Sequence, residues 1–341
     1  MKQHKIYLDI LNVLACISVI YMHCNGIVHS FSNTTAWKQS MIIETIAYWA
    51  VPVFFMISGA TLLNYRDRYD TKTYLKKRII RVGLPFIIWS TVNLMWKIKV
   101  GKIVITDFTV SSLITLYLNS QIENVYWFFI PLFAVYFSIP VLSKIVRERQ
   151  ILNYMMVLGF ATYSVFPTMF SVLGITYNSS LNFPLTGGYV LYVLLGYYLD
   201  TEEISLKRRS VIYLFAVLGA GIRYFSTIYF SVKTGEIYKI FWGYLNFPTV
   251  VLSMGVFVLI KYIKWDIIFN TLQSIEIISN ISSTSFGIYL IHMIIMNGFW
   301  YVGVDTHGLK WRILGAPLIY VICFIVVKII KRIPILKKIV P

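Results

Sequence analysis

Charged side chains are scarce in this chain. Only 13% of its 341 residues are Asp, Glu, Lys or Arg, about half of the roughly 25% that is usual in soluble domains. A soluble protein of this size could not cover its surface with so few charges. Hydrophobic residues make up 58% of the chain and aromatic residues 17%. The composition therefore excludes a soluble protein and predicts an all-α, polytopic integral membrane protein.

Acidic residues and cysteines are the scarcest of the chemically active types. There are 14 Asp and Glu against 31 Lys and Arg, a formal net charge of +17. In a soluble protein this charge would indicate nucleic acid, but here the basic residues lie between apolar runs, as in cytoplasmic loops. We therefore expect no nucleic-acid partner. Cys16, Cys24 and Cys323 lie in apolar runs without metal-ligand spacing, so we expect buried thiols, no metal and no permanently bound cofactor.

Long hydrophilic stretches are also missing, so any chemistry has to be built within the helices. We expect one transmembrane domain, 1–341, and no separate soluble domain. About ten apolar runs predict membrane spans: 8–28, 41–63, 80–98, 126–144, 152–173, 186–199, 210–231, 241–261, 282–302 and 311–330. Segment 103–119 is apolar but contains Asp107 and several hydroxyls. It predicts an interfacial or re-entrant helix, with a full span as the alternative. Most Lys and Arg fall on one side if both termini are cytoplasmic, which predicts that orientation.

The first apolar run, Leu8 to Ile27, carries Asn12 and His23 inside it. These two residues are eleven positions apart, which at about 100° per residue places both on one helix face, roughly 16 Å apart along the axis. Polar side chains at such depth face protein or a wet cavity. Histidine is also the side chain best suited to exchange a proton near neutral pH. We therefore predict a site around this face.

A basic loop follows the second predicted span. Arg78 and Arg81, next to Lys77, stand where the third span enters the membrane, and Ser58 and Gly59 end the preceding span at a similar depth. Guanidinium groups match phosphate oxygens, so this region could hold an anionic ligand such as a nucleotide diphosphate from the cytoplasm. The alternative is that the loop only fixes topology.

Arg223 lies inside the seventh predicted span, where an isolated cation needs a partner or water. Glu123 and Glu44 are at compatible depth, so a structural Arg–Glu pair is one interpretation. The other is a polar cavity under His23, lined also by Asn246.

Three further residues have two interpretations each. Tyr126 and Trp127 belong either to the interfacial aromatic belt or to the cavity. His292, near the middle of the ninth span, either packs helices through a hydrogen bond or belongs to the site.

The chain resembles the membrane acyltransferase-3 family, bacterial enzymes that include O-acetyltransferases of surface polysaccharides. The motifs that carry the resemblance run in family order over essentially the whole chain: LDILNVLACISVIYMH in the first run, FFMISG at 54–59, KKRIIRVGLP at 76–85, YWFF from Tyr126, GYYL at 196–199 and TSFGIYLIH at 284–292.

The resemblance implies site residues one by one. The family has an arginine and a histidine separated by ten residues in the first span. His23 matches the histidine, which the family uses in catalysis, whereas Asn12 stands in place of the arginine. Arg78 and Arg81 match a basic pair that handles the acyl-CoA donor.

The resulting hypothesis is an acyltransferase of the bacterial inner membrane. Cytosolic acyl-CoA, with acetyl-CoA expected, is the co-substrate and binds through Arg78, Arg81, Lys77, Ser58 and Asn12. His23 acts as general base, or carries the acyl group, for a hydroxyl of an extracytoplasmic glycan or lipid-linked sugar. Membrane lipids surround the protein. The alternatives are a transporter or flippase for a small polar solute or lipid-linked sugar, and a structural scaffold.

Overall fold

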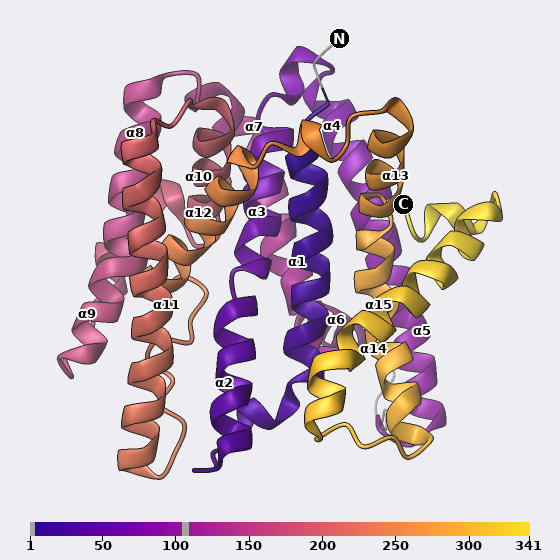
Figure 1. Ribbon diagram of the computed structural model, residues 1–341. Helices are drawn as coiled ribbons and strands as arrows, with labels where there is room; N and C mark the ends of the chain where they lie inside the picture. The colour runs from indigo at the N-terminus through magenta and orange to yellow at the C-terminus, as the bar shows by residue number, and fades with distance from the viewer. Residues whose placement is uncertain (1–3, 104–108) are drawn as a thin grey trace.

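The protein is a bundle of helices in a computed structural model that describes residues 4–103 and 109–341 (Figure 1). Helix makes up 77% of the structure, and the described residues form no strand. Seven helical segments are long and apolar enough to cross a membrane, or eight if one bent pair is a single span. Two more predicted spans correspond to the shorter apolar helices Val190–Thr201 and Phe247–Tyr262. The polytopic helical fold is confirmed, while the count of ten and the cytoplasmic termini stay predictions.

Fifteen α-helices are distinguished in the described part of the chain. Their bounds are α1 Ile6–Cys24, α2 Thr35–Ala47, α3 Ala50–Leu62, α4 Thr71–Arg78, α5 Leu84–Lys99, α6 Val110–Leu118, α7 Phe129–Ile145, α8 Arg149–Phe160, α9 Phe166–Val172, α10 Val190–Thr201, α11 Leu206–Thr234, α12 Phe247–Tyr262, α13 Leu272–Ser282, α14 Ser285–Tyr301 and α15 Leu309–Arg332.

The expected interfacial segment 103–119 is only partly described. Its described part contains α6, whose nine residues are too few to cross a bilayer. Residues 104–108, including Asp107, lie outside the described residues.

The helix α1 stands in the middle of the bundle, between α2 and α3 on one side and α13 to α15 on the other (Figure 1). The loops α3–α4, α7–α8, α10–α11 and α12–α13 all lie at the end of the bundle where α1 begins. Because these loops carry the basic runs, the arrangement is consistent with the expected cytoplasmic side. This side is called the inner side below, following that expectation.

Two glycines let α3 and α10 pack backbone against backbone. A Cβ added at Gly59 would lie 1.9 Å from the Val193 carbonyl oxygen, and one at Gly196 would lie 2.1 Å from the Met56 carbonyl oxygen. Only glycine fits at such an approach. Gly59 therefore serves helix packing, and the neighbouring Ser58 hydroxyl donates to the Phe54 carbonyl of its own helix at 3.0 Å.

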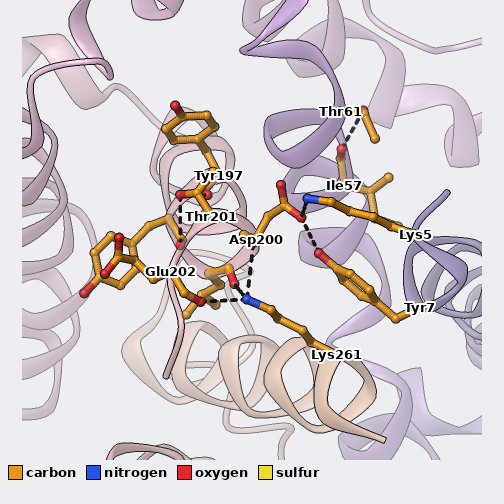
Figure 2. Close-up of polar contacts among 11 residues, drawn as sticks. Lys5, Tyr7, Ile57, Thr61, Tyr197, Asp200, Thr201, Glu202 and Lys261 are labelled. Atoms are coloured by element: carbon orange, nitrogen blue, oxygen red, sulfur yellow. Dashed lines mark hydrogen bonds and ion pairs between the residues drawn. The ribbon is translucent and has the colours of Figure 1, made fainter. Parts of the chain in front are cut away.

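At the inner end, a polar cluster ties the beginning of α1 to α10 and α12 (Figure 2). Lys5 Nζ lies 2.6 Å from Asp200 Oδ1, and the Tyr7 hydroxyl donates to the same oxygen. Lys261 on α12 donates to the carbonyls of Leu199, at 2.8 Å, and Glu202, at 2.7 Å. The cluster therefore satisfies the last carbonyls of α10 and fixes the position of α1.

Candidate functional site

A cavity of about 510 Å³ runs along α1. Its lining includes Asp9 and Asn12 from the inner half of α1, His23 near the other end of that helix, and His29 beyond it. From Asp9 to His23 the helix rises roughly 21 Å. The remaining lining residues are Val19 and Met22 of α1 and residues in or next to α2, α3, α13, α14 and the segments before α7 and α12: Glu44, Tyr48, Val51, Phe54, Val125, Trp127, Phe128, Trp242, Tyr244, Ser279, Ser282, Ser283, Ser285, Phe286 and Tyr289. The cavity therefore extends over both halves of the bundle.

His23 faces a second histidine. Its ring centroid lies 5.2 Å from that of His292, which is fully buried behind it on α14. His292 Nδ1 lies 2.6 Å from the Tyr289 carbonyl oxygen. Because a carbonyl only accepts, this nitrogen carries the proton and Nε2 is an acceptor. Nε2 is buried and has no hydrogen-bond partner in the described part of the chain. The structure thus brings together the two predicted histidines.

The position of α14 beside His23 is fixed by two tyrosines. The Tyr126 hydroxyl donates to the Leu290 carbonyl at 2.6 Å, and the Tyr289 hydroxyl donates to the Val125 carbonyl. Both carbonyls belong to segments that flank the cavity. Tyr126, a predicted cavity residue, does not line the cavity but holds the helix that carries His292.

At the inner end of the cavity, Asn12 is hydrogen-bonded to the last residue of α13. Its amide nitrogen donates to the Ser282 carbonyl at 2.9 Å and lies 3.0 Å from the Ser282 hydroxyl. α13 and α14 are bent by 46° at this point. Asn12 therefore lines the cavity and supports a break in the helix at the same time.

At the outer end, Glu44 and Arg223 are both buried. The Arg223 guanidinium lies 3.4 Å from the centroid of the Tyr48 ring and donates to the Phe241 carbonyl at 2.8 Å. Glu44 lines the cavity and is close enough to Arg223 for electrostatic attraction, although the two make no ion pair within 4 Å. Arg223 itself does not line the cavity, so it acts on the cavity through the lining residues Glu44 and Tyr48.

Aromatic rings form the remaining outer wall. Tyr244 stacks on Tyr48 with centroids 4.3 Å apart, and Trp127 stacks on the same Tyr244 ring at 5.4 Å. At the mouth, His29 meets Trp242 edge to face. Burial and the positive charge of Lys239 lower the pKa of His29, which keeps this imidazole neutral at pH 7.

Two of the predicted cavity residues lie elsewhere. Glu123 pairs with Lys97 at 3.0 Å rather than with Arg223. Asn246 precedes α12, and its side-chain amide donates to the Ile240 carbonyl. Neither residue lines the cavity.

Four of the five predicted donor residues lie outside the cavity. Arg78 and Ser58 both lie close to the Tyr136 side chain, and the Arg78 guanidinium lies 5.6 Å from the centroid of the Tyr136 ring. Arg81 is exposed and lies within a π-helical turn, Ile79–Gly83, that begins directly after Arg78. Lys77 lies 3.8 Å from the centroid of the Tyr69 ring. Of the five predicted donor residues, only Asn12 lines the cavity.

Several lining residues were not predicted, among them Tyr48, Trp242, Tyr244, Ser285 and Tyr289. The run Ser282–Ser285 was the one available signal, because consecutive hydroxyl residues disfavour a continuous helix. Tyr48, Trp242 and Tyr244 look like membrane-belt aromatics in sequence. The described residues contain no group of three or more His, Cys, Asp and Glu that could hold a metal ion.

Comparison with known proteins gives one match. A family model described as an acyltransferase domain, of the acyltransferase-3 family, matches residues 5–330. No curated protein and no solved structure gives a significant match.

Proposed function

This chain belongs to the acyltransferase-3 family and is a membrane acyltransferase, and from this premise we propose its donor, acceptor and catalytic residue. The donor is cytosolic acyl-CoA, with acetyl-CoA as the expected form. The acceptor is a hydroxyl of an extracytoplasmic glycan or lipid-linked sugar. The setting we propose is the bacterial inner membrane.

The observation that carries the proposal is the cavity along α1. It reaches from Asp9 and Ser279, near the inner side, past His23 to His29 and Trp242. A donor that enters from one end and an acceptor that enters from the other can therefore meet at one imidazole. Its volume of about 510 Å³ is within the usual range for small-molecule sites.

In the proposed reaction, His23 removes the proton of the acceptor hydroxyl. The hydroxyl oxygen then bonds to the thioester carbonyl carbon, the carbon–sulfur bond breaks, and the CoA thiolate takes the proton that His23 holds. A well-placed general base contributes roughly 10²–10⁴-fold. In a second route, His23 attacks the thioester carbonyl carbon and the carbon–sulfur bond breaks to release the CoA thiolate. The acceptor oxygen then bonds to the acyl carbon, the carbon–nitrogen bond breaks, and the proton of the hydroxyl goes to the thiolate.

The acceptor end has the chemistry that a sugar requires. Trp127, at the end of the ring stack, offers a ring surface, and Glu44 offers carboxylate oxygens, one of which is buried without a hydrogen-bond partner in the described part of the chain. Pyranose rings present apolar C–H faces and hydroxyl donors, which match these two features. The nucleotide of CoA is proposed to stay outside the cavity, with its phosphates at Arg78 and Arg81.

The first test is binding of acetyl-CoA and CoA to detergent-purified protein, with wild type beside Arg81→Ala and His23→Ala. We expect binding that persists in His23→Ala and weakens in Arg81→Ala. Acyl transfer should be lost in His23→Ala. Transfer at the wild-type rate in that variant would refute the catalytic role of His23.

The transporter hypothesis makes the opposite prediction. A transporter should bind no CoA and should move its solute in response to a proton gradient. Folded wild-type protein that binds neither CoA nor acetyl-CoA would therefore refute the proposed donor.

A further inference from the structure

The start of α14 opens into the cavity. α13 ends at Ser282 and α14 begins at Ser285, after a bend of 46°. The first hydrogen bond of the new helix runs from the Ile288 amide to the Thr284 carbonyl at 2.9 Å. The N–H groups of the first turn therefore have no acceptor within α14. Ser285 and Phe286, which belong to this turn, both line the cavity.

The Ser285 side chain is an independent sign of a ligand site at this place. Ser285 is only 2% exposed, and its hydroxyl is buried with no hydrogen-bond partner in the described part of the chain. An unpaired buried hydroxyl destabilises the empty protein. A bound oxygen atom at this position would supply the missing partner.

The charge distribution around the cavity favours an oxygen-bearing group here. No Lys or Arg is among the described residues that line the cavity, whereas Asp9 and Glu44 are. Position 12 holds asparagine, where the resemblance implies arginine. The helix N-terminus, which carries a partial positive charge, is therefore an electropositive group in the cavity wall itself, while the Lys331 ammonium donates to the Ser283 carbonyl at the same break, at 2.7 Å. Half-helix N-termini bind anionic or carbonyl oxygens in the same way in broken membrane helices.

The depth of this turn identifies the part of the donor that would reach it. Cys16 Sγ lies 3.5 Å from the Ser285 carbonyl oxygen, so the two residues are level. His23 is seven positions further along α1, roughly 10 Å away. The pantetheine arm joins the thioester to the phosphates and has about as many bonds along its chain as the backbone of four amino-acid residues. Its extended length is therefore roughly 14 Å. A thioester placed at His23 therefore sets the amide carbonyls of this arm, and not the phosphates, beside Ser285.

We propose that the first turn of α14 and the Ser285 hydroxyl bind an amide carbonyl of the pantetheine arm of the donor. This assignment rests on the proposed function. It gives the helix break a role, and it gives Asn12 the role of a positioning residue that holds the break through Ser282.

The test compares two donors that share the arm, acetyl-CoA and S-acetylpantetheine, which lacks the nucleotide. Affinities are measured on full-length protein in detergent for wild type, Ser285→Ala and Arg81→Ala. Ser285→Ala should weaken binding of both donors by about 3–10-fold, the value of one hydrogen bond. Arg81→Ala should weaken binding of acetyl-CoA alone.

Ser164→Ala is the matched control. Ser164 is also buried, and its hydroxyl has no partner among the described residues, but it lies outside the cavity. Both alanine variants should unfold at the wild-type temperature or above, because each removes an unpaired buried hydroxyl. Only Ser285→Ala should lose affinity, which a purely structural role would not produce.

Each result separates the hypotheses. Wild-type affinity for both donors in Ser285→Ala overturns this assignment and leaves the proposed function intact. A loss confined to acetyl-CoA would place phosphates at α14 and also overturns it. Folded wild type that binds neither donor overturns the proposed function and, with it, this assignment.

Discussion

The imidazole of His292 stands directly behind that of His23, with the ring planes inclined by 35° and the centroids 5.2 Å apart. His23 lines the cavity, whereas His292 does not. The rear ring has its Nδ1 hydrogen-bonded to the Tyr289 carbonyl, and its Nε2 has no hydrogen-bond partner among the described residues. In the proposed reaction His292 would act on His23 as an orienting residue, as in other base–orienter pairs.

Two substitutions at His292 separate the role of its Nε2 as a hydrogen-bond acceptor from the role of its Nδ1, which is hydrogen-bonded to the Tyr289 carbonyl. Asparagine can replace the Nδ1 donor to Tyr289 but has no atom at the Nε2 position, whereas glutamine places an amide near Nε2. We expect His292→Asn to lower kcat by about 10–100-fold, within the range for base catalysis, and His292→Gln to lower it less. The measurement is release of CoA from acetyl-CoA in vesicles, with donor affinity unchanged in both variants. If His292→Asn were active and His292→Gln inactive, only the hydrogen bond to the Tyr289 carbonyl would matter for activity.

Asn12 supports the helix break through its amide donor. In Asn12→Asp a carboxylate faces the Ser282 carbonyl, so the hydrogen bond is lost and two acceptors are opposed. We expect Asn12→Asp to destabilise the protein by about 1–3 kcal/mol and more than Asn12→Ala does. Thermal unfolding in detergent measures this difference. Ser282→Ala is the control, because it removes the hydroxyl acceptor and keeps the carbonyl. Equal melting temperatures for Asn12→Asp and Asn12→Ala would contradict the role of the donor.

The α3–α10 contact has no room for a methyl group. Gly59→Ala would put a Cβ 1.9 Å from the Val193 carbonyl oxygen, so the helices must separate, at a cost of about 1–3 kcal/mol or more. Gly298→Ala is the matched control within a helix, because nothing lies within 4 Å of its added Cβ. Alanine is the better helix former there and should be neutral or stabilising. A Gly59→Ala protein as stable as wild type would refute this account of the packing.

Arg223 and Glu44 should be energetically coupled. Arg223→Met leaves the buried Glu44 carboxylate without its nearest cation, and Glu44→Gln removes the charge that Arg223 offsets. The double variant should therefore be more stable than the two single effects predict, with a coupling of about 0.5–3 kcal/mol. Chemical unfolding of wild type, both single variants and the double variant gives this value. Additive effects would mean that Tyr48, and not Glu44, compensates the guanidinium.

The helical membrane fold was predictable because its signal is long and repeated. Runs of apolar residues identify helices whatever their neighbours are. The prediction of His23 in a cavity-facing position came from an equally local signal, a polar side chain inside such a run, and the structure gives it that position. Whether His23 is catalytic stays a prediction.

The contacts around the site were harder to predict, because they join segments far apart in the chain. Glu123 and Glu44 were equally compatible with Arg223 by depth, and only packing shows that Glu123 meets Lys97. Arg78 and Arg81 look like neighbours on a regular helix, but Arg81 lies in a π-helical turn that begins directly after Arg78, which changes their relative orientation. Arg78 packs on Tyr136, while Arg81 is exposed.

The connections of α1 also constrain how the protein is made. α1 leaves the ribosome long before its partners do, because Asn12 bonds to Ser282, 270 residues later, and Lys5 bonds to Asp200, 195 residues later. Until α13 and α14 have been inserted, Asn12 and His23 have none of their final partners on those helices. Biogenesis must therefore hold the partly polar helix α1 in the membrane until α13 and α14 have been synthesised, and no fragment that stops before α14 can contain a finished site.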